Sequence, residues 1–392
     1  MNTVHVTYDG ALDPLGASQV VPYLLGLARR GVRPTLVSFE KPERWADRPA
    51  RERLVRQLEG AGVAWRPLSY HRRPRLAATA WDLAAGARAV RGAVRDTQAV
   101  LVHCRGDVAM AMARLACRGL AVRLVYEARG LFRDERVEVG SWRAGGLTDR
   151  LVLAFERGNL RAAHGLLCVM ASPGLAALKA RRDPLPPFRH LPNSVDTSAF
   201  RPRAAGTKPE FGLAYHGSLG GWYPTAEIVT LGRMAARHVP GRVLFLTPQP
   251  ELARAAGADP SWAEVASAAP RDVPAWLARA RAAFFVIQPS PAKRASSPTK
   301  FAEALACGLP VLANGASGDL ESILEPEGVG ALVHELSPPA YEAAARRLAE
   351  LLTDPQVAGR CRSLAERRYS LDAAVAAYHD LYLELAADGF HS

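Results

Sequence analysis

The stretch from Phe284 to Asn314, FFVIQPSPAKRASSPTKFAEALACGLPVLAN, constrains the fold of this chain more than any other. Its first four residues are an apolar run with the length and composition of a buried strand. A basic loop follows, and Ser297-Pro298 is typical of a helix start, because serine accepts unpaired amide hydrogens and proline has none. Gly308 ends the predicted helix, and Leu309 begins another strand. This order of elements predicts an α/β protein.

The same stretch has the features of an anion site. A helix N-terminus presents unpaired N–H groups and about half a positive charge to a phosphate. Lys300 lies on the first turn of the predicted helix, Lys293 and Arg294 lie in the loop before it, and Glu303 lies about one turn further along. The alternative is an ordinary strand, loop and helix in which Glu303 is only solvated.

The residues SPTKFAEALACGLPVLAN resemble the donor-binding segment of GT-B glycosyltransferases, specifically the large retaining group called family 4. Those enzymes carry two glutamates in this segment, and the second precedes a small-residue helix and a Gly-x-Pro-Val strand. The second glutamate corresponds to Glu303, whereas Ala295 stands where the first would fall. The resemblance implies that Glu303 holds the ribose hydroxyls of a nucleotide and that the contact to the sugar differs here.

Composition bounds the class of protein. With 392 residues, 49% of them hydrophobic and 22% charged, the chain is long enough for two globular domains. No apolar run approaches the roughly 20 residues that span a bilayer, and the N-terminus has no secretory pattern. The five cysteines are scattered without metal-binding spacing, which predicts a cytoplasmic protein without structural metal or disulfide.

The formal net charge is +12, and nearly all of the basic residues are arginines. Codon bias is one explanation of this excess. The other is a surface that attracts anions, either nucleotide phosphates or an anionic bilayer, since arginine pairs with phosphate through two hydrogen bonds. Nucleic acid is not an expected partner, because the chain has no basic tail, aromatic RNA-binding motif or zinc-finger spacing.

The N-terminal residues predict a strand, a glycine-rich turn, a helix and a second strand, and therefore a parallel sheet. The strand begins at Val4, the helix is expected to be capped by Ser18, and Gly31 ends it. The turn resembles the first loop of the same glycosyltransferases, which implies that Gly16 lets the backbone approach the donor. It is not a GxGxxG fingerprint, so a dinucleotide site is disfavoured. The alternative is that Gly16 serves only the turn.

Charged residues follow two predicted strands of the N-terminal half, where doubly wound sheets bind ligands. His103 and Arg105 end one strand, and Glu127 and Arg129 follow another. Relatives often have a His-x-His pair at the first position, so the resemblance places His103 near the transferred sugar. We expect His103, Arg105 and Arg129 to be catalytic and Glu127 to bind the acceptor. The alternatives are a structural histidine and an internal ion pair.

Residues 65–95 interleave aromatic and basic side chains, namely Trp65, Tyr70 and Trp81 with seven arginines. Such a mixture suits a protein that rests on anionic headgroups. We expect Tyr70 and Arg72 to contact the acceptor. The alternative is a solvated helix with ordinary core aromatics. Further along, Leu147 to Ala163 predicts an amphipathic helix.

The second half of the chain repeats the α/β rhythm, and the loop His216 to Pro224 can bring backbone amides against a pyrophosphate. Many relatives carry an arginine and a lysine in this loop, and this chain has neither, so Arg294 and Lys300 are expected to supply the charge. The full set implied by the resemblance is, at the donor, Gly217, Ser218, Ser297 and Thr299 with Arg294, Lys300 and Glu303, and, at the base, Arg271 and Val273.

The resemblance covers nearly the whole chain in the right order. It predicts two Rossmann-like domains facing a cleft, an acceptor-binding domain over 1–192 and a nucleotide-sugar-binding domain over 193–370. Residues 371–392 are expected to form a helix that packs back on the first domain. HLPNSVDTSAFRP, residues 190–202, resembles the family's crossover between domains.

We therefore expect a retaining hexosyltransferase-type enzyme that moves a sugar from a nucleotide sugar to a hydroxyl acceptor. The expected setting is the assembly of a cell-surface glycan or glycolipid, in the cytoplasm and at the inner face of the membrane. Basic side chains and helix amides can neutralise the leaving diphosphate, so neither a metal nor a cofactor is expected. The alternatives are glycosylation of a soluble specialised metabolite, a sugar-nucleotide epimerase of the same fold, and a scaffold that binds nucleotide without transfer.

Overall fold

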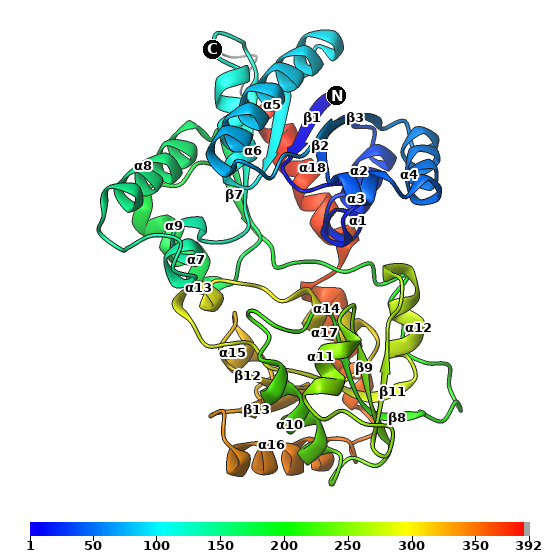
Figure 1. Ribbon diagram of the computed structural model, residues 1–392. Helices are drawn as coiled ribbons and strands as arrows, with labels where there is room; N and C mark the ends of the chain where they lie inside the picture. Colours follow the sequence, from blue (N-terminus) through cyan, green and yellow to red (C-terminus); the bar gives the residue numbers. More distant parts are fainter. Residues whose placement is uncertain (388–392) are drawn as a thin grey trace. The chain divides into compact units, whose positions relative to one another are not determined.

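The computed structural model describes residues 1–387, apart from the side chains of residues 75 and 76. The end of the predicted C-terminal segment, residues 388–392, lies outside the described residues. The chain divides into two compact units (Figure 1). Unit 1 comprises 1–170, 174–192 and the segment from Leu371 onward, and unit 2 comprises 171–173 and 193–370.

Unit 1 is built on a parallel sheet of seven strands in the order β3-β2-β1-β4-β5-β6-β7. The strands are β1 (Asn2–Thr7), β2 (Arg33–Glu40), β3 (Ala64–Ser69), β4 (Leu101–Arg105), β5 (Arg123–Ala128), β6 (Gly165–Cys168) and β7 (Phe188–His190). The helices are α1 (Pro14–Gln19), α2 (Val21–Arg29), α3 (Pro42–Trp45), α4 (Arg48–Gly60), α5 (Arg75–Thr97), α6 (Asp107–Ala116), α7 (Phe132–Glu138), α8 (Leu147–Ala162), α9 (Ser172–Arg181) and α18 (Leu371–Ala387).

The strand order of unit 1 reverses between β1 and β4, and this is where doubly wound sheets bind ligands. Thr7 of β1 lies opposite Arg105 of β4, and Arg105 lies opposite Glu127 of β5. The buried apolar runs of these strands, such as Leu101–Val102, are those of a sheet covered on both faces. The charged residues Arg105 and Glu127 therefore lie side by side at the carboxyl ends of β4 and β5, next to the end of β1.

Unit 2 has a second parallel sheet, in the order β10-β9-β8-β11-β12-β13. The strands are β8 (Phe211–His216), β9 (Arg242–Leu246), β10 (Ala263–Ala266), β11 (Ala280–Phe285), β12 (Val311–Asn314) and β13 (Gly330–Val333). The helices are α10 (Thr225–Ala235), α11 (Pro250–Ala255), η1 (Pro270–Asp272), α12 (Val273–Leu277), α13 (Pro291–Arg294), α14 (Thr299–Ala306), α15 (Leu320–Ile323), α16 (Pro338–Leu351) and α17 (Val357–Arg368). The predicted α/β class, with two Rossmann-like domains, is confirmed.

Two helix starts differ from the sequence prediction. Helix α1 begins at Pro14, so Ser18 lies inside it, and its hydroxyl donates to the carbonyl of Pro14 over 2.9 Å. Helix α14 begins at Thr299, and the Ser297 hydroxyl accepts a hydrogen bond from the Asn193 amide over 3.2 Å. The partner of Ser18 lies one helical turn earlier, whereas the partner of Ser297 lies 104 positions away, where sequence spacing cannot reveal it.

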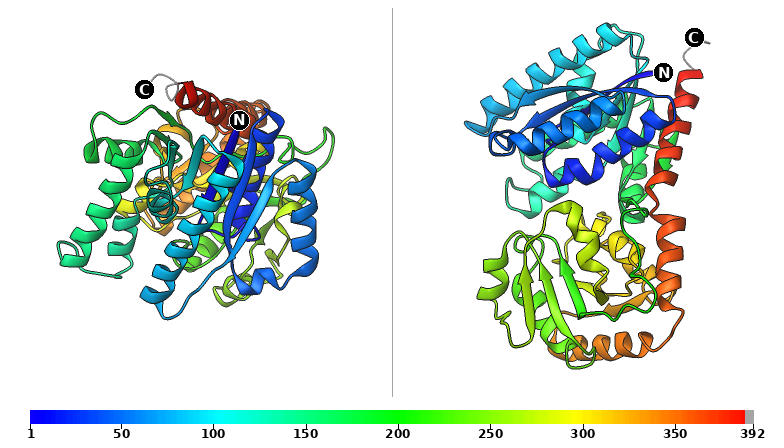
Figure 2. Two further views of the ribbon diagram at one scale, coloured as in Figure 1. Left: turned by 90° about the horizontal axis from the view of Figure 1, so that it is seen from above. Right: turned by 90° about the vertical axis from the view of Figure 1, so that its right-hand side faces the viewer.

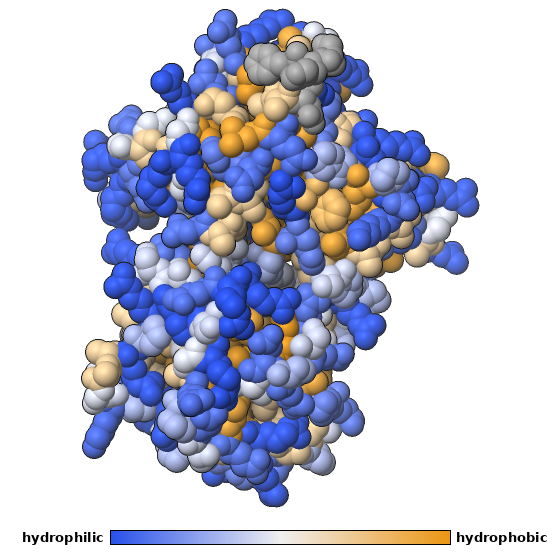
Figure 3. Space-filling view, turned by 180° about the vertical axis from the view of Figure 1, so that it is seen from behind, coloured by the Kyte–Doolittle hydropathy of each residue, from blue (hydrophilic) through white to orange (hydrophobic). Residues whose placement is uncertain are grey.

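Helix α18 packs against α2 within unit 1 (Figure 2). Tyr378 and Tyr382 lie in a core cluster with Tyr23 and Leu167. Gly26 permits the approach, because a Cβ atom there would lie 2.7 Å from a methyl group of Val375. Figure 3 shows one face of the surface, which is largely hydrophilic with scattered apolar groups. No helix in residues 1–387 is long and apolar enough to cross a membrane.

Candidate functional site

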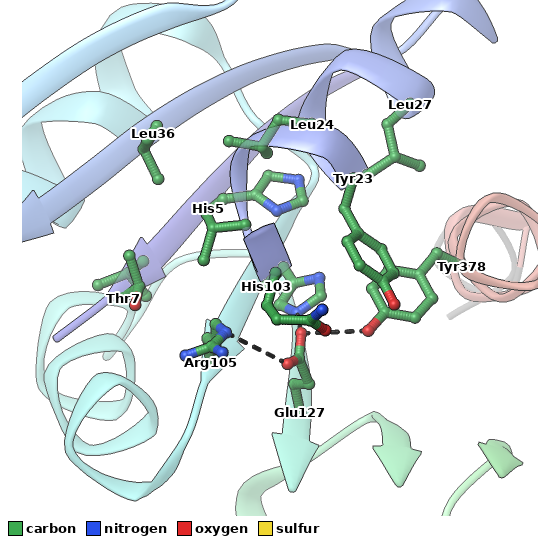
Figure 4. A pocket seen from close by; sticks show the side chains of 13 residues that line it. His5, Thr7, Tyr23, Leu24, Leu27, Leu36, His103, Arg105, Glu127 and Tyr378 are labelled. Atoms are coloured by element: carbon green, nitrogen blue, oxygen red, sulfur yellow. Dashed lines mark hydrogen bonds and ion pairs between the residues drawn. The ribbon is translucent and has the colours of Figure 1, made fainter. Parts of the chain in front are cut away.

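A buried cluster of charged side chains lies where β4 and β5 end, and Figure 4 shows His103, Arg105 and Tyr378 around Glu127. His103 Nε2 lies 2.8 Å from Glu127 Oε2. Arg129 Nη1 donates to Glu127 Oε1 over 2.6 Å, and Arg105 Nε lies 3.5 Å from the same oxygen. Both guanidinium groups therefore lie against one carboxylate.

The charge of Glu127 follows from these contacts. Burial alone would raise the pKa of Glu127, because it disfavours the ionised form, but Arg129, His103 and Arg105 outweigh burial and hold the pKa far below its usual range. Glu127 is therefore a permanent carboxylate at neutral pH. It is suited to orienting cations and unsuited to general-base work, which needs a pKa near the working pH.

His103 is held on both sides. Its Nδ1 bonds to the Tyr382 hydroxyl and its Nε2 to Glu127, so neither ring nitrogen is open to a substrate in this arrangement. The Tyr378 hydroxyl also donates to Glu127, over 3.3 Å. This geometry argues against the catalytic role expected for His103 and favours a positioning role. The two tyrosines come from α18, the helix most distant in sequence.

Asp9 is a site residue that the sequence analysis missed. It follows β1, and its carboxylate accepts a hydrogen bond from Arg105 Nη1. The Asp9 side chain is 43% exposed, whereas that of Arg105 is 5% exposed. The buried ion pairs thus end at a carboxylate that faces solvent. The reasoning that selected Arg105 and Glu127, a charged residue at a strand end beside the switch point, would also have selected Asp9.

A small cavity adjoins this cluster, lined among others by His5, Gln19, Tyr23 and Arg105. Its volume, measured as the space open to the centre of a water molecule, is about 20 Å³. That is enough for a buried water and too little for a substrate. His5 Nε2 and Arg105 Nη2 are buried without a hydrogen-bond partner among the described residues. Burial, followed by the charge of His103, lowers the pKa of His5.

The structure gives Gly16 a packing role. A Cβ atom at Gly16 would lie 2.0 Å from the carbonyl oxygen of Gly10. The amides of Ala11 and Leu12 donate to the buried carboxylate of Glu40, over 2.8 and 3.2 Å. An internal carboxylate therefore occupies two of the turn amides, and the close approach within the turn explains Gly16 without a donor.

Of the three residues expected at the acceptor, Glu127 lies in the buried cluster, and Tyr70 and Arg72 have other partners. The Tyr70 ring packs edge-on against Tyr8, with ring centres 5.2 Å apart. The Tyr8 hydroxyl donates to Asp82 over 2.9 Å. Arg72 donates to Glu43 over 2.6 Å in an exposed pair. Tyr70 thus lies beside the end of β1, whereas Arg72 is neutralised at the surface.

In unit 2, Lys300 is enclosed by aromatic rings at the start of α14. Its Nζ lies 3.7 Å from the ring centre of Tyr223 and 4.7 Å from that of Tyr215. Its hydrogen bond to the Tyr215 hydroxyl is 3.4 Å long. Burial, opposed in part by Glu303, lowers the pKa of Lys300 to about 7. Gly217 has a positive φ, and because it has no side chain it leaves room for Nζ, which would lie 3.2 Å from a Cβ atom there.

Glu303 lies on the same helix and bonds to His216, with 2.8 Å between Oε2 and Nε2. Its side chain is 17% exposed. His216 ends β8 and precedes Gly217, so the structure brings the glycine-rich loop, Lys300 and Glu303 together. The sequence analysis named the loop and the helix, but not the histidine that joins them.

Most of the other residues expected at the donor and the base lie at the surface of unit 2. Arg294 ends α13 and is exposed. Ser218 is exposed and Thr299 begins α14. Arg271 is exposed in η1, 3.7 Å from the Asp272 carboxylate, and the half-buried Val273 begins α12. Within residues 1–387, no group of three or more His, Cys, Asp or Glu side chains is placed to hold a metal ion.

Comparison with solved structures gives the fold class. The chain is similar to sucrose-phosphate synthase from Thermosynechococcus elongatus, with 17% identity, a TM-score of 0.69 and coverage of 99% of this chain and 100% of that one. A glycosyltransferase from Rickettsia africae gives 11% identity, a TM-score of 0.67 and 98% coverage of both chains. HepE from Anabaena, in complex with UDP and glucose, gives 15% identity, a TM-score of 0.64, and coverage of 98% of this chain and 99% of that one. These likenesses define the GT-B fold.

Two family models match the sequence itself. The model described as Glycosyltransferase Family 4 matches residues 17–199, and the model described as Glycosyl transferases group 1 matches residues 229–354. The chain belongs to the GT-B glycosyltransferases of the family-4 type. No curated protein sequence matches it significantly.

Proposed function

We propose that this glycosyltransferase uses a nucleotide-sugar donor, which unit 2 binds around Lys300 and Glu303. The observation that carries the proposal is a buried lysine at a helix start, beside a glutamate of the family's donor segment. Within residues 1–387 this lysine has no carboxylate within ion-pair distance. A diphosphate would supply the missing negative charge. HepE is in complex with UDP and, in another structure, with UDP-glucose, which makes uridine nucleotides the first donors to test.

In this proposal Glu303 binds the ribose hydroxyls, and Lys300 binds the diphosphate. The amides of Gly217 and Ser218 and the first turn of α14 at Thr299 add hydrogen bonds to the phosphates. Arg294 is an additional cation for the outer phosphate, and Ser297, Arg271 and Val273 keep their proposed places at the helix start and at the base. These roles rest on the family segment and on the geometry within unit 2.

In unit 1 we propose that Arg105 and Arg129 provide positive charge at the strand ends, and that Glu127 fixes both. Because the pKa of Glu127 is far too low for a general base, acceptor deprotonation falls to an oxygen of the leaving diphosphate. No metal has a step in this scheme. Transfer with retention of configuration and an acceptor in a cell-surface glycan or glycolipid complete the proposal, with a soluble metabolite as the competing acceptor.

The deciding experiment incubates the protein with a panel of nucleotide sugars and candidate acceptors and follows the products by mass spectrometry and NMR. We expect nucleoside diphosphate and a glycoside with the donor's anomeric configuration. A glycoside of opposite configuration would refute retention. A changed donor formed without acceptor would identify an epimerase, and bound but unconverted donor with every acceptor would favour the scaffold.

A further inference from the structure

Helix α8 in unit 1 buries acidic and polar side chains and exposes two of its leucines. It buries Asp149, Glu156 and Asn159, each no more than 5% exposed. On the other side Leu147 is 76% exposed and Leu151 is 62% exposed. A surface helix normally turns its apolar stripe to the core and its charges to water. The expected amphipathic helix is therefore present, but part of its apolar stripe faces outward.

The buried acids of α8 are neutralised inside unit 1. Asp149 pairs with Arg133 at 2.6 Å, and Glu156 pairs with Arg181 at 3.1 Å. The fully exposed charged residues of 132–162 are all arginines: Arg136, Arg143, Arg150, Arg157 and Arg161. The acidic residues of this segment are buried or half-buried. The outer surface therefore carries positive charge without exposed acids between.

The apolar and basic side chains share one surface. Residues three and four apart lie on the same helix face, which groups Leu147, Leu151 and Ala154 with the arginines at 150, 157 and 161. Val139, in the loop between α7 and α8, adds an aliphatic side chain that is 56% exposed. Figure 1 places α8 at the outer edge of unit 1.

The stretch 65–95, expected to contact a membrane, fits that role less well. The Trp65 indole donates to the Ser38 hydroxyl over 2.8 Å. Tyr70 packs on Tyr8, and Arg66 pairs with Asp96 at 2.9 Å. Trp81 is its exposed aromatic residue, at 66%. Trp65, Tyr70 and Arg66 therefore make contacts within unit 1.

We propose that the outer face of α8, together with the α7–α8 loop, docks on an anionic lipid bilayer. Exposed leucines can enter the boundary between headgroups and acyl chains, and guanidinium groups bind lipid phosphates through two hydrogen bonds. Acidic lipid complements a surface whose exposed charges are all positive. This inference concerns where the enzyme lies and is independent of the donor assignment.

The test is co-sedimentation of the full chain with vesicles of phosphatidylglycerol and phosphatidylcholine in equal parts, against vesicles of phosphatidylcholine alone. We expect binding to the acidic vesicles that weakens with added salt. The double variant Leu147→Glu with Leu151→Glu should lose about tenfold or more, since both side chains are more than half exposed and leave the core intact. Arg150→Gln with Arg157→Gln should lose about 25-fold, at roughly fivefold for each arginine.

Leu115→Glu is the matched control, because Leu115 is an exposed leucine of unit 1 outside this face, at 45%. It should bind vesicles like the wild type. All variants should keep wild-type melting and UDP binding, so failure of the donor proposal would appear separately. The proposal is overturned if the wild type ignores acidic vesicles at low salt, or if the leucine variant binds them unchanged. It is also overturned if the face proves to join two protein chains, seen as a vesicle-free oligomer that the leucine variant dissolves.

Discussion

If Lys300 binds the diphosphate as proposed, nucleotide binding should depend on pH, and replacing Lys300 with methionine tests this directly. Burial among Tyr215, Tyr223 and neighbouring side chains lowers the pKa of Lys300 from 10.5 to about 7. A diphosphate beside Nζ favours the ammonium form and raises that pKa again. Above pH 7 the Lys300 amine of the unliganded protein is therefore mostly neutral, and binding of the diphosphate should be accompanied by uptake of a proton at Nζ.

The magnitude follows from this linkage. Between about pH 7.5 and 9, where nucleotide phosphates and ordinary imidazoles have lost their protons, affinity for UDP should fall about tenfold per pH unit. At pH 7, Lys300→Met should weaken UDP binding by about 1.5–3 kcal/mol, the usual contribution of a hydrogen bond to a charged group. The variant should bind UDP without this pH dependence, and uridine affinity should change little.

Stability provides an independent check with the opposite sign. Because the folded pKa of Lys300 lies below its unfolded value of 10.5, the folded protein binds fewer protons between about pH 7 and 10.5, and stability rises with pH across that window. The cost of the buried ammonium is fully present below pH 7. Lys300→Met should therefore raise the melting temperature at neutral and mildly acidic pH while it weakens binding.

The assay is isothermal titration calorimetry of UDP in two buffers with different ionisation enthalpies. Near pH 8 the wild type should take up close to one proton, and the variant almost none. The reasoning is refuted if the wild type binds UDP with no proton uptake. It is equally refuted if Lys300→Met and the wild type show the same pH profile.

Three further outcomes are expected. Glu303→Ala should weaken UDP and uridine alike, by roughly 1.5–3 kcal/mol in calorimetry, since it removes a ribose ligand; unchanged uridine affinity would contradict that role. Glu127→Gln should cost about 3–5 kcal/mol in urea unfolding, because it leaves Arg105 and Arg129 buried without their carboxylate. The pKa of Glu127 is lowered in the folded state, so Glu127 stabilises the fold above its ordinary pKa of 4.5, and this stabilisation is lost as the pH falls below that value. If Glu127→Gln unfolds in acid like the wild type, the ion pairs do not stabilise the fold. Transfer should survive a chelator, and loss restored by Mg²⁺ or Mn²⁺ would overturn the metal-free scheme.

Local patterns were sufficient for the fold. Apolar runs, glycine stops and the strand–loop–helix order around Phe284 to Asn314 predicted the α/β class, because these signals act between near neighbours in sequence. The ends of the strands could also be predicted from the sequence. The charged residues at those ends include Arg105 and Glu127, which form an ion pair in the structure. Asp9 follows the end of β1, so the same rule also identifies Asp9.

The contacts within the candidate sites depend on residues that are far apart in the sequence. His103 bonds to Tyr382, 279 positions away, and Glu303 bonds to His216, 87 positions away. Neither contact leaves a trace in local spacing. The amphipathic pattern of α8 likewise shows a stripe, but only the fold shows that Leu151 is exposed while Leu160 is buried. Periodicity predicts that a helix has two faces, and tertiary packing decides which one is covered.

The arrangement of the arginines now bears on the explanation left open by composition. Codon bias adds arginines without regard to what surrounds them, so exposed arginines should stand among exposed acids as often as not. In residues 65–95 this is close to what occurs, since Arg66 pairs with Asp96 and Arg72 pairs with Glu43. In residues 132–162 the acids turn inward and the exposed charges are all arginine. Bias in composition does not orient side chains, so this arrangement supports the proposal that the α8 face docks on an anionic surface, where part of the net charge of +12 would have a physical use.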